Sequence, residues 1–177
     1  MIEKEKRWWA LYVLCAGELM IVLDTTVVNV ALPSIRESLG FSEASLVWVV
    51  NAYMLTYGGF LLLGGRMADL FGRRRLFILG TVGFTIASLL SGLAHNTEML
   101  IGARFFQGLM AAIMVPQILS IIQILYTTTK ERQGISAFYG ALAGIATVLG
   151  PILGALLITG DVFGLGWRTI FLVNLPT

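Results

Sequence analysis

The sequence predicts an all-α bundle of membrane-spanning helices, with five complete spans and the start of a sixth. Of its 177 residues, 57% are hydrophobic and only 12% are charged, whereas average soluble domains carry about 25% charged residues. A helix needs about 20 apolar residues to cross the hydrocarbon core of a membrane. Five mainly apolar stretches reach that length. Transmembrane strands are not expected, because they would alternate apolar and polar residues in short segments.

The predicted spans follow one another with short connections. They cover residues 8–33, 46–65, 76–94, 99–126 and 134–159. A sixth span begins near Arg168 and reaches the last residue before it could cross a membrane. Residues 1–177 are therefore expected to form one incomplete helical bundle.

The segment 65–75, Gly-Arg-Met-Ala-Asp-Leu-Phe-Gly-Arg-Arg-Arg, orients the bundle. Its five charges cannot lie in hydrocarbon, so it is predicted to be a hairpin in water between the second and third spans. Short loops rich in Lys and Arg remain in the cytoplasm. Alternating loops then place nine of the twelve basic residues inside: Lys4, Lys6, Arg7, Arg66, Arg73, Arg74, Arg75, Lys130 and Arg132. This pattern predicts a multi-pass protein of the cell membrane with a cytoplasmic N-terminus.

Three ionisable residues fall within the predicted spans: Glu18 and Asp24 in the first, and Arg104 in the fourth. Each costs about 2.5–3.5 kcal/mol at mid-bilayer, so such residues are rare unless they face a cavity or a partner. At a rise of 1.5 Å per residue, Asp24 lies about 13 Å and Arg104 about 8 Å from the outer end of its helix. We predict that these two residues share a polar cavity, paired directly or through water. Alternatively, Arg104 extends to the outer interface and Asp24 bonds local hydroxyls such as that of Thr25 or Thr26.

The fourth span carries a small and polar face. Arg104, Gln107, Gly108 and Ala111 are spaced i, i+3, i+4 and i+7, so they lie on one side of the helix. That face suits a lumen or a close helix contact, and it adds Gln107 to the candidate cavity. For Glu18, two interpretations stay open: a functional carboxylate of the same cavity, or a neutral carboxyl group in a packed interface.

The fifth span contains glycines at near-helical spacing, including Gly144, Gly150 and Gly154. Small residues at this spacing let another helix approach closely. Pro151 removes a backbone hydrogen bond and should kink the span. Close packing explains the glycines, but a Gly-Pro pair in the middle of a helix also suggests a hinge.

Several chemistries lack the residues that they require. There is no Walker-type glycine loop, so direct use of ATP is not expected. The only histidine, His95, lies in an outer loop, and no Cys/His cluster could bind a metal. No nucleophile–base arrangement is present, so we expect neither enzymatic activity nor a cofactor. The loops account for the basic residues, and no nucleic-acid partner is expected.

Five motifs, in order along the chain, resemble those of the major facilitator superfamily. Segment 65–75 is similar to its cytoplasmic loop motif, G-x-L-a-D-r-x-G-r-k, through Gly65, Asp69, Gly72, Arg73 and Arg74, with Leu70 in place of a basic residue. Residues 23–33 resemble the first-helix motif of its fourteen-helix drug:proton antiporter branch (EmrB/QacA-type). The remaining three matches are R-x-x-Q-G at 104–108, the antiporter motif Gly150-Pro151-x-x-Gly154, and a sixth-helix entry at 167–176.

The resemblance implies efflux of a lipophilic or amphipathic compound in exchange for protons, by alternating access, with the proton gradient as energy source. Asp24 would take part in protonation or cation binding, and Arg104 would favour its carboxylate form. Asp69 and Arg73 would form a charge latch on the cytoplasmic side.

The expected partners are the lipid bilayer, protons, a small-molecule substrate and a missing C-terminal half, because each half of such a transporter needs six helices. This N-terminal bundle alone is not expected to transport. Two alternatives remain: an exporter of one metabolite, siderophore or lipid, and a membrane interaction fragment that does not transport.

Overall fold

The computed structural model describes residues 4–161 and 164–175, apart from the side chains of residues 4–6. Within these ranges all regular structure is helical. The long helices are α1 (Lys4–Leu39), α2 (Glu43–Phe71), α3 (Arg73–Gly92), α4 (Thr97–Leu125) and α5 (Thr129–Thr159), followed by the 3-10 turn η2 (Gly166–Arg168) and the short α6 (Thr169–Leu172). The five long helices are apolar enough to cross a membrane. The predicted all-α bundle is confirmed.

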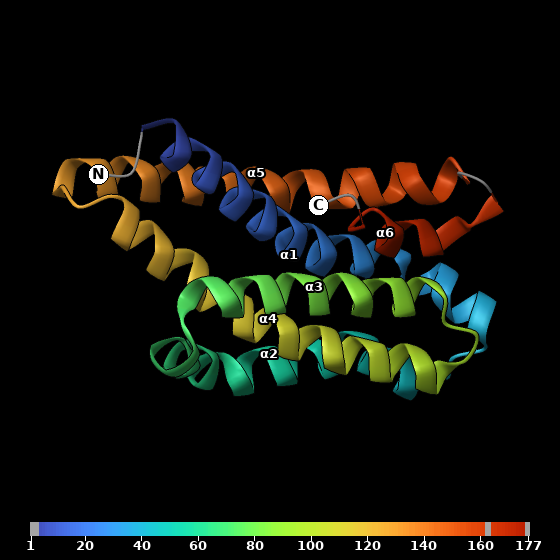
Figure 1. Cartoon of the computed structure of the whole chain (residues 1–177). Coiled ribbons are helices and arrows are strands. Elements are labelled where there is room, and N and C mark those ends of the chain that lie inside the picture. Colours follow the sequence, from blue (N-terminus) through green and yellow to red (C-terminus); the bar gives the residue numbers. More distant parts are fainter. Residues whose placement is uncertain (1–3, 162–163, 176–177) are drawn as a thin grey trace.

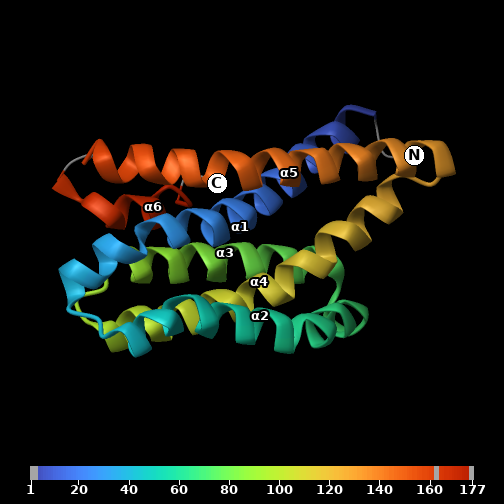
Figure 2. The ribbon, with the colours of Figure 1, turned by 180° about the vertical axis from the view of Figure 1, so that it is seen from behind.

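The helices form two layers, which Figures 1 and 2 show from opposite sides. In one layer α4 packs against both α2 and α3. In the other, α1 and α5 lie side by side, and α6 lies next to α1 and against α3. Contacts between α1 and α4 are fewer than those of α4 with α2 or α3, and the contact of α6 with α3 also joins the two layers.

The connections alternate between the two ends of the bundle. The start of α1, the turn between α2 and α3, and the connection between α4 and α5 lie together at one end (Figure 1). The chain order therefore gathers the basic segments at residues 4–7, 66–75 and 130–132 at the same end, as the predicted alternation of loops requires.

The helices are longer than the apolar windows suggested. α2 continues to Phe71, so the predicted hairpin over 65–75 is wrong in extent and reduces to Gly72. Gly72 has a φ of 87°, a conformation that glycine adopts without strain. Hydropathy falls at the first charged side chain, whereas helical hydrogen bonding continues until a cap or a break ends it.

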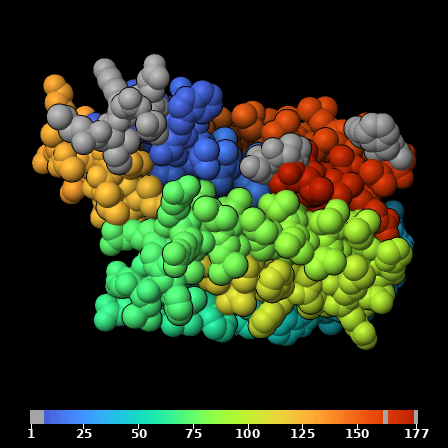
Figure 3. Space-filling model, viewed as in Figure 1, coloured from blue at the N-terminus to red at the C-terminus, as the bar shows by residue number. Residues whose placement is uncertain are grey.

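Two hydrophobic clusters fill the interior. One includes Tyr53, Phe84 and Ile118, and the other includes Val28 and Ile35 together with the α6 residue Phe171. The outer surface is also apolar: α3 and α4 form the lower part of the face in Figure 3, and the α3 side chains Ile78, Leu79 and Val82 are each about half exposed. Such a surface suits contact with lipid.

Candidate functional site

Asp24 and Arg104 form a direct ion pair that joins the two layers. Nη1 of Arg104 lies 2.6 Å from Oδ2 of Asp24, and neither side chain is more than 1% exposed. The hydroxyls of Thr25 and Thr26 donate to the carbonyl of Val22 instead of to Asp24. The alternative in which Arg104 extends to the outer interface is therefore wrong, and no open cavity separates the pair.

Gln107 closes this pair into a three-residue network. Nη1 of Arg104 also donates to Oε1 of Gln107 at 2.7 Å, and Nε2 of Gln107 donates to Oδ1 of Asp24 at 2.9 Å. Both carboxylate oxygens thus accept a hydrogen bond. Full hydrogen bonding is the condition under which a buried ion pair offsets the cost of leaving water.

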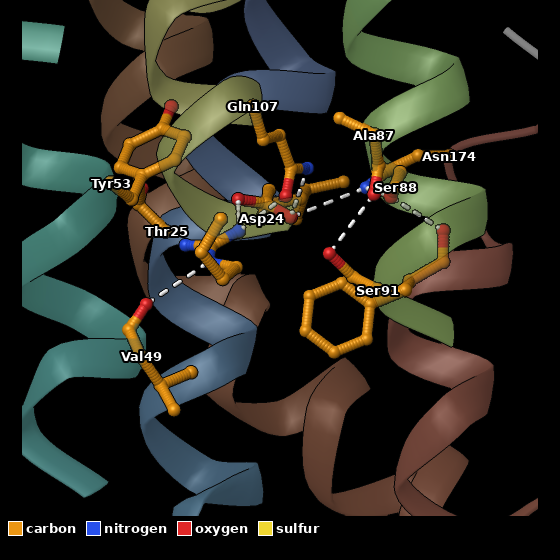
Figure 4. Close-up of polar contacts among 12 residues, drawn as sticks. Asp24, Thr25, Val49, Tyr53, Ala87, Ser88, Ser91, Gln107 and Asn174 are labelled. Carbon is orange, nitrogen blue, oxygen red and sulfur yellow. Dashed lines mark hydrogen bonds and ion pairs between the residues drawn. The ribbon is translucent and has the colours of Figure 1, made fainter. Parts of the chain in front are cut away.

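α2 fixes the guanidinium of Arg104 from another direction. Nε of Arg104 donates to the carbonyl of Val49 at 3.2 Å, a bond visible in Figure 4. The guanidinium carbon lies 4.4 Å from the ring centroid of Tyr53 and 5.7 Å from that of Phe171. A cation over an aromatic face is attracted to it, more strongly when water is excluded. The position of the charge is therefore determined by three helices besides its own.

The sequence spacing of α4 explains why α2 can come so close. Arg104, Gln107, Gly108 and Ala111 are all buried on one face, as predicted. A Cβ atom on Gly108 would overlap the carbonyl oxygen of Tyr53 and the hydroxyl of Thr56. That hydroxyl donates to the carbonyl of Phe105 at 2.9 Å. The absent side chain of Gly108 thus allows α2 to reach Arg104.

Two further residues belong to the network and were not proposed as site residues from the sequence. Nδ2 of Asn174 donates to Oγ of Ser88 at 3.0 Å and lies 3.5 Å from Oδ1 of Asp24, and Ser88 donates to the carbonyl of Phe171 at 2.8 Å (Figure 4). Asn174 stands in the motif at 167–176 and could have been found there; Pro176 of that motif lies outside the described residues. Ser88 gives no sequence signal, because one serine in a span of small residues is common.

Glu18 does not join this network. It lies six residues before Asp24, which at 3.6 residues per turn places it on a different side of α1. Its carboxyl group neighbours the hydroxyl of Tyr139 on α5. The structure therefore separates the four predicted cavity residues into the buried Asp24–Arg104–Gln107 network and an independent Glu18.

The residues predicted as a hinge form a close contact between α1 and α5. A Cβ atom on Gly150 would overlap Oγ1 of Thr26, and one on Gly154 would come within 2.9 Å of Cγ1 of Val27. α5 is helical on both sides of Pro151, which is exposed. The glycines thus have a packing role, and hinge motion remains a prediction.

The loop-motif residues gather at the turn between α2 and α3. Asp69 lies 3.3 Å from Arg66 and 3.9 Å from Arg73. Gly65 lies inside α2, and a Cβ atom at this position would lie 3.7 Å from Cβ of Pro116 on α4. Arg74 is exposed. Both ion pairs of Asp69 stay within the turn, so the charge latch remains a prediction.

A bundle of spanning helices around a buried, fully hydrogen-bonded ion pair is typical of membrane transport proteins, in which ionisable groups inside the membrane mark ion and substrate pathways. The family model described as Major Facilitator Superfamily matches residues 14–177. The chain belongs to the major facilitator superfamily.

Curated relatives include exporters and resistance proteins for antibiotics. The chain is 44% identical over 97% of its length to the "Probable actinorhodin transporter" of Streptomyces coelicolor, 29% of which is covered. It is 47% identical over 97% of its length to "Puromycin resistance protein pur8" of Streptomyces alboniger, covering 33%, and 40% identical over 94% to "Cephamycin export protein CmcT" of Amycolatopsis lactamdurans, covering 34%. The chain thus spans about a third of the length of these relatives.

Proposed function

We propose that this chain is part of a transporter that exports lipophilic or amphipathic compounds in exchange for protons. The observation that carries the proposal is the buried ion pair of Asp24 and Arg104, held by Gln107. The names of the relatives, which include a transporter and an export protein for antibiotics, support export as the direction of transport.

The ion pair suggests how a proton could be coupled to a change of shape. Protonation of Asp24 would remove the charge that holds Arg104 at 2.6 Å, and the guanidinium would then need another partner. Because few other contacts join α1 to α4, loss of the pair would shift the balance between two arrangements of the layers. A substrate that binds better when Asp24 is charged would compete with a proton at this residue. Such competition is the requirement for exchange.

A second candidate within the same family is an exporter dedicated to one compound. The relatives that are named after a single antibiotic favour this reading. The two candidates share the ion pair and differ in the breadth of their substrates. A resistance profile against chemically unrelated compounds separates them.

We also propose that a second helical bundle completes the transport pathway against α2 and α5. Only 22% of the most apolar window of α2 and 17% of that of α5 is buried, compared with 50% for each of the other three spans. Both helices also carry uncovered glycines, Gly58 and Gly59 on α2 and Gly140 and Gly144 on α5, with no atom within 4 Å of a Cβ position in the described structure. Small residues are typical of helix–helix contacts, so we expect another helix there.

The test uses inverted membrane vesicles containing the complete transporter. An imposed pH gradient, acidic inside, should drive accumulation of a fluorescent lipophilic substrate, and a protonophore should abolish it. Asp24→Asn should lose this coupling, whereas Glu37→Gln, the same change at an exposed site on α1, should keep it. Accumulation that ignores the pH gradient would contradict proton exchange. Residues 1–177 expressed alone should not export; pH-driven export by that segment would contradict the need for a second bundle.

A further inference from the structure

A second set of hydrogen bonds joins the carboxylate of Asp24 to α6 and α3. Nδ2 of Asn174, just after α6, lies 3.5 Å from Oδ1 of Asp24 and donates to Oγ of Ser88 on α3 at 3.0 Å. The hydroxyl of Ser88 donates in turn to the carbonyl of Phe171, inside α6, at 2.8 Å. The polar groups thus lead from α1 to α6, and α3 holds them from the other side (Figure 4).

α6 depends on its neighbours for its position. It is a single turn, Thr169–Leu172, and so short a helix is not stable by its own hydrogen bonds. A Cβ atom on Gly92 of α3 would lie 3.2 Å from Cδ2 of Leu172. Ser88 and Gly92 are four residues apart, so they present one face of α3 to α6. Contacts with α1 and α3 therefore decide where α6 lies.

The link between α6 and α1 depends on the charge of Asp24. A carboxylate accepts stronger hydrogen bonds than a neutral group does. Asp24, Ser88 and Asn174 are each at most 2% exposed, so water does not compete for these bonds. The ring of Phe171 also faces the other member of the ion pair, with its centroid 5.7 Å from the guanidinium carbon of Arg104. Protonation of Asp24 would weaken the acceptor that Asn174 shares with the ion pair.

The charged and titratable groups around Asp24 leave this role to neutral donors. In the described structure Arg104 faces it from α4, and Tyr53 lies close to both charges from α2. The charged side chains of α3 and α5 lie in their first turns. Arg168, before α6, donates to the carbonyl of Ala94 at 2.9 Å. α6 and α3 thus meet the carboxylate through an amide and a hydroxyl.

We propose that Asn174, oriented by Ser88, is a positioning residue that ties α6 to Asp24, so that protonation of Asp24 loosens α6. This inference rests on the proposed function and names the element that responds to the proton. The amide of Asn174 acts through the carboxylate and needs no contact with substrate. Loosening of α6 gives the change of charge a structural effect on a third helix, beyond α1 and α4.

Hydrogen exchange in the purified complete transporter at a single pH tests this link. Asp24→Asn stands for the protonated state, because it is neutral and of similar size. The readout is exchange at the amides of residues 169–173, with residues 141–156 of α5 as the internal reference. Asp24→Asn should speed exchange in α6 by about tenfold relative to α5, the scale expected for one hydrogen bond to a charged group. In an Asn174→Leu background the same change should have no further effect on α6.

Two serines of α3 supply a matched pair of controls. Ser88→Ala should reduce the effect of Asp24→Asn on α6, because the amide of Asn174 loses the hydroxyl that orients it. Ser91→Ala should leave the effect intact: Ser91 is also fully buried, but its hydroxyl donates to the carbonyl of Ala87 within α3, at 3.0 Å. This pair decides the question alone if Asn174→Leu does not fold.

Three outcomes would overturn the positioning role. They are unchanged exchange in α6 of Asp24→Asn, an equal acceleration in α5, and an Asp24→Asn effect of the same size with and without Asn174 or Ser88. The proposed function fails separately. If α6 responds as expected but wild-type vesicles show no pH-driven export, the link stands and proton exchange does not. If export is driven by pH while α6 ignores Asp24→Asn, the reverse holds.

Discussion

The charged atoms of Arg104 and Asp24 lie 2.6 Å apart although eighty positions separate the two residues in the chain. Each belongs to a different layer of the bundle, and each has almost no exposed surface. The carbonyl of Val49 accepts a hydrogen bond from Nε of the same guanidinium, and Gln107 donates to the second oxygen of the carboxylate. The stability of the pair and its proposed role in coupling therefore depend on the same small set of hydrogen bonds.

Removing one partner of this pair should be costly. Arg104→Leu leaves a buried carboxylate without its cation, and such changes lower the free energy of unfolding by about 3–5 kcal/mol. Arg104→Lys keeps the charge but cannot donate to Asp24, Gln107 and Val49 with a planar fork, so its loss should be intermediate. Thermal unfolding in detergent measures both. The double variant Asp24→Asn with Arg104→Gln should recover part of the loss, and wild-type stability of Arg104→Leu would contradict the prediction.

How far the sequence could predict this site depends on which property is considered. Depth along a helix follows from residue counting, so it was possible to predict that Asp24 and Arg104 lie at similar levels. The shared face of Arg104 and Gln107 follows from the helical period. Rotation of one helix against another depends on packing across the bundle. For that reason the direct contact between Asp24 and Arg104 became visible only in the structure, whereas the separation of Glu18 from Asp24 on one helix already follows from the helical period.

The ends of the helices show a second limit of prediction from hydropathy. Capping side chains define where α2, α4 and α5 begin: Ser42, Asn96 and Thr128 accept hydrogen bonds from the backbone N–H groups three residues later. These residues precede the apolar windows and are recognisable N-cap types. An estimate that started from the caps would have placed the helix starts correctly. The end of α2 was harder to predict, because its charged last turns continue the helix into water.

The contact between α1 and α5 predicts a sensitive glycine. Gly150→Ala places a methyl group onto Thr26, and overpacking of this kind typically costs about 1–3 kcal/mol. Unfolding temperature and expression level should both fall. Gly102→Ala, on α4, is the matched control, because no atom lies within 4 Å of its Cβ position in the described structure. That change should be neutral or slightly stabilising, since alanine favours helix more than glycine does. Equal tolerance of both variants would show that α1 and α5 do not pack as described.

Asp69 should matter for transport and little for stability. Its side chain is 53% exposed, and its partners Arg66 and Arg73 are also accessible. Exposed ion pairs contribute about 0–1 kcal/mol, so Asp69→Asn should unfold near the wild-type temperature. If the charge latch operates, the transport rate should nevertheless fall. Glu43→Gln, which removes an exposed pair with Arg36 at the opposite end of the bundle, should leave transport unchanged. A wild-type rate for Asp69→Asn would remove the latch.

The proposed orientation in the membrane can be tested with single cysteines. Cys15 is the chain's own cysteine and is buried, so Cys15→Ser gives a background to which one cysteine at a time can be added. Leu70→Cys, at a position 76% exposed in the arginine-rich turn, keeps every basic residue and should react with a membrane-impermeant maleimide only after cells are opened. His95→Cys, in the exposed connection between α3 and α4, should react on intact cells. The expectation follows from the excess of Lys and Arg in cytoplasmic loops. Labelling of Leu70→Cys on intact cells, together with protection of His95→Cys, would reverse the bundle and place the N-terminus outside.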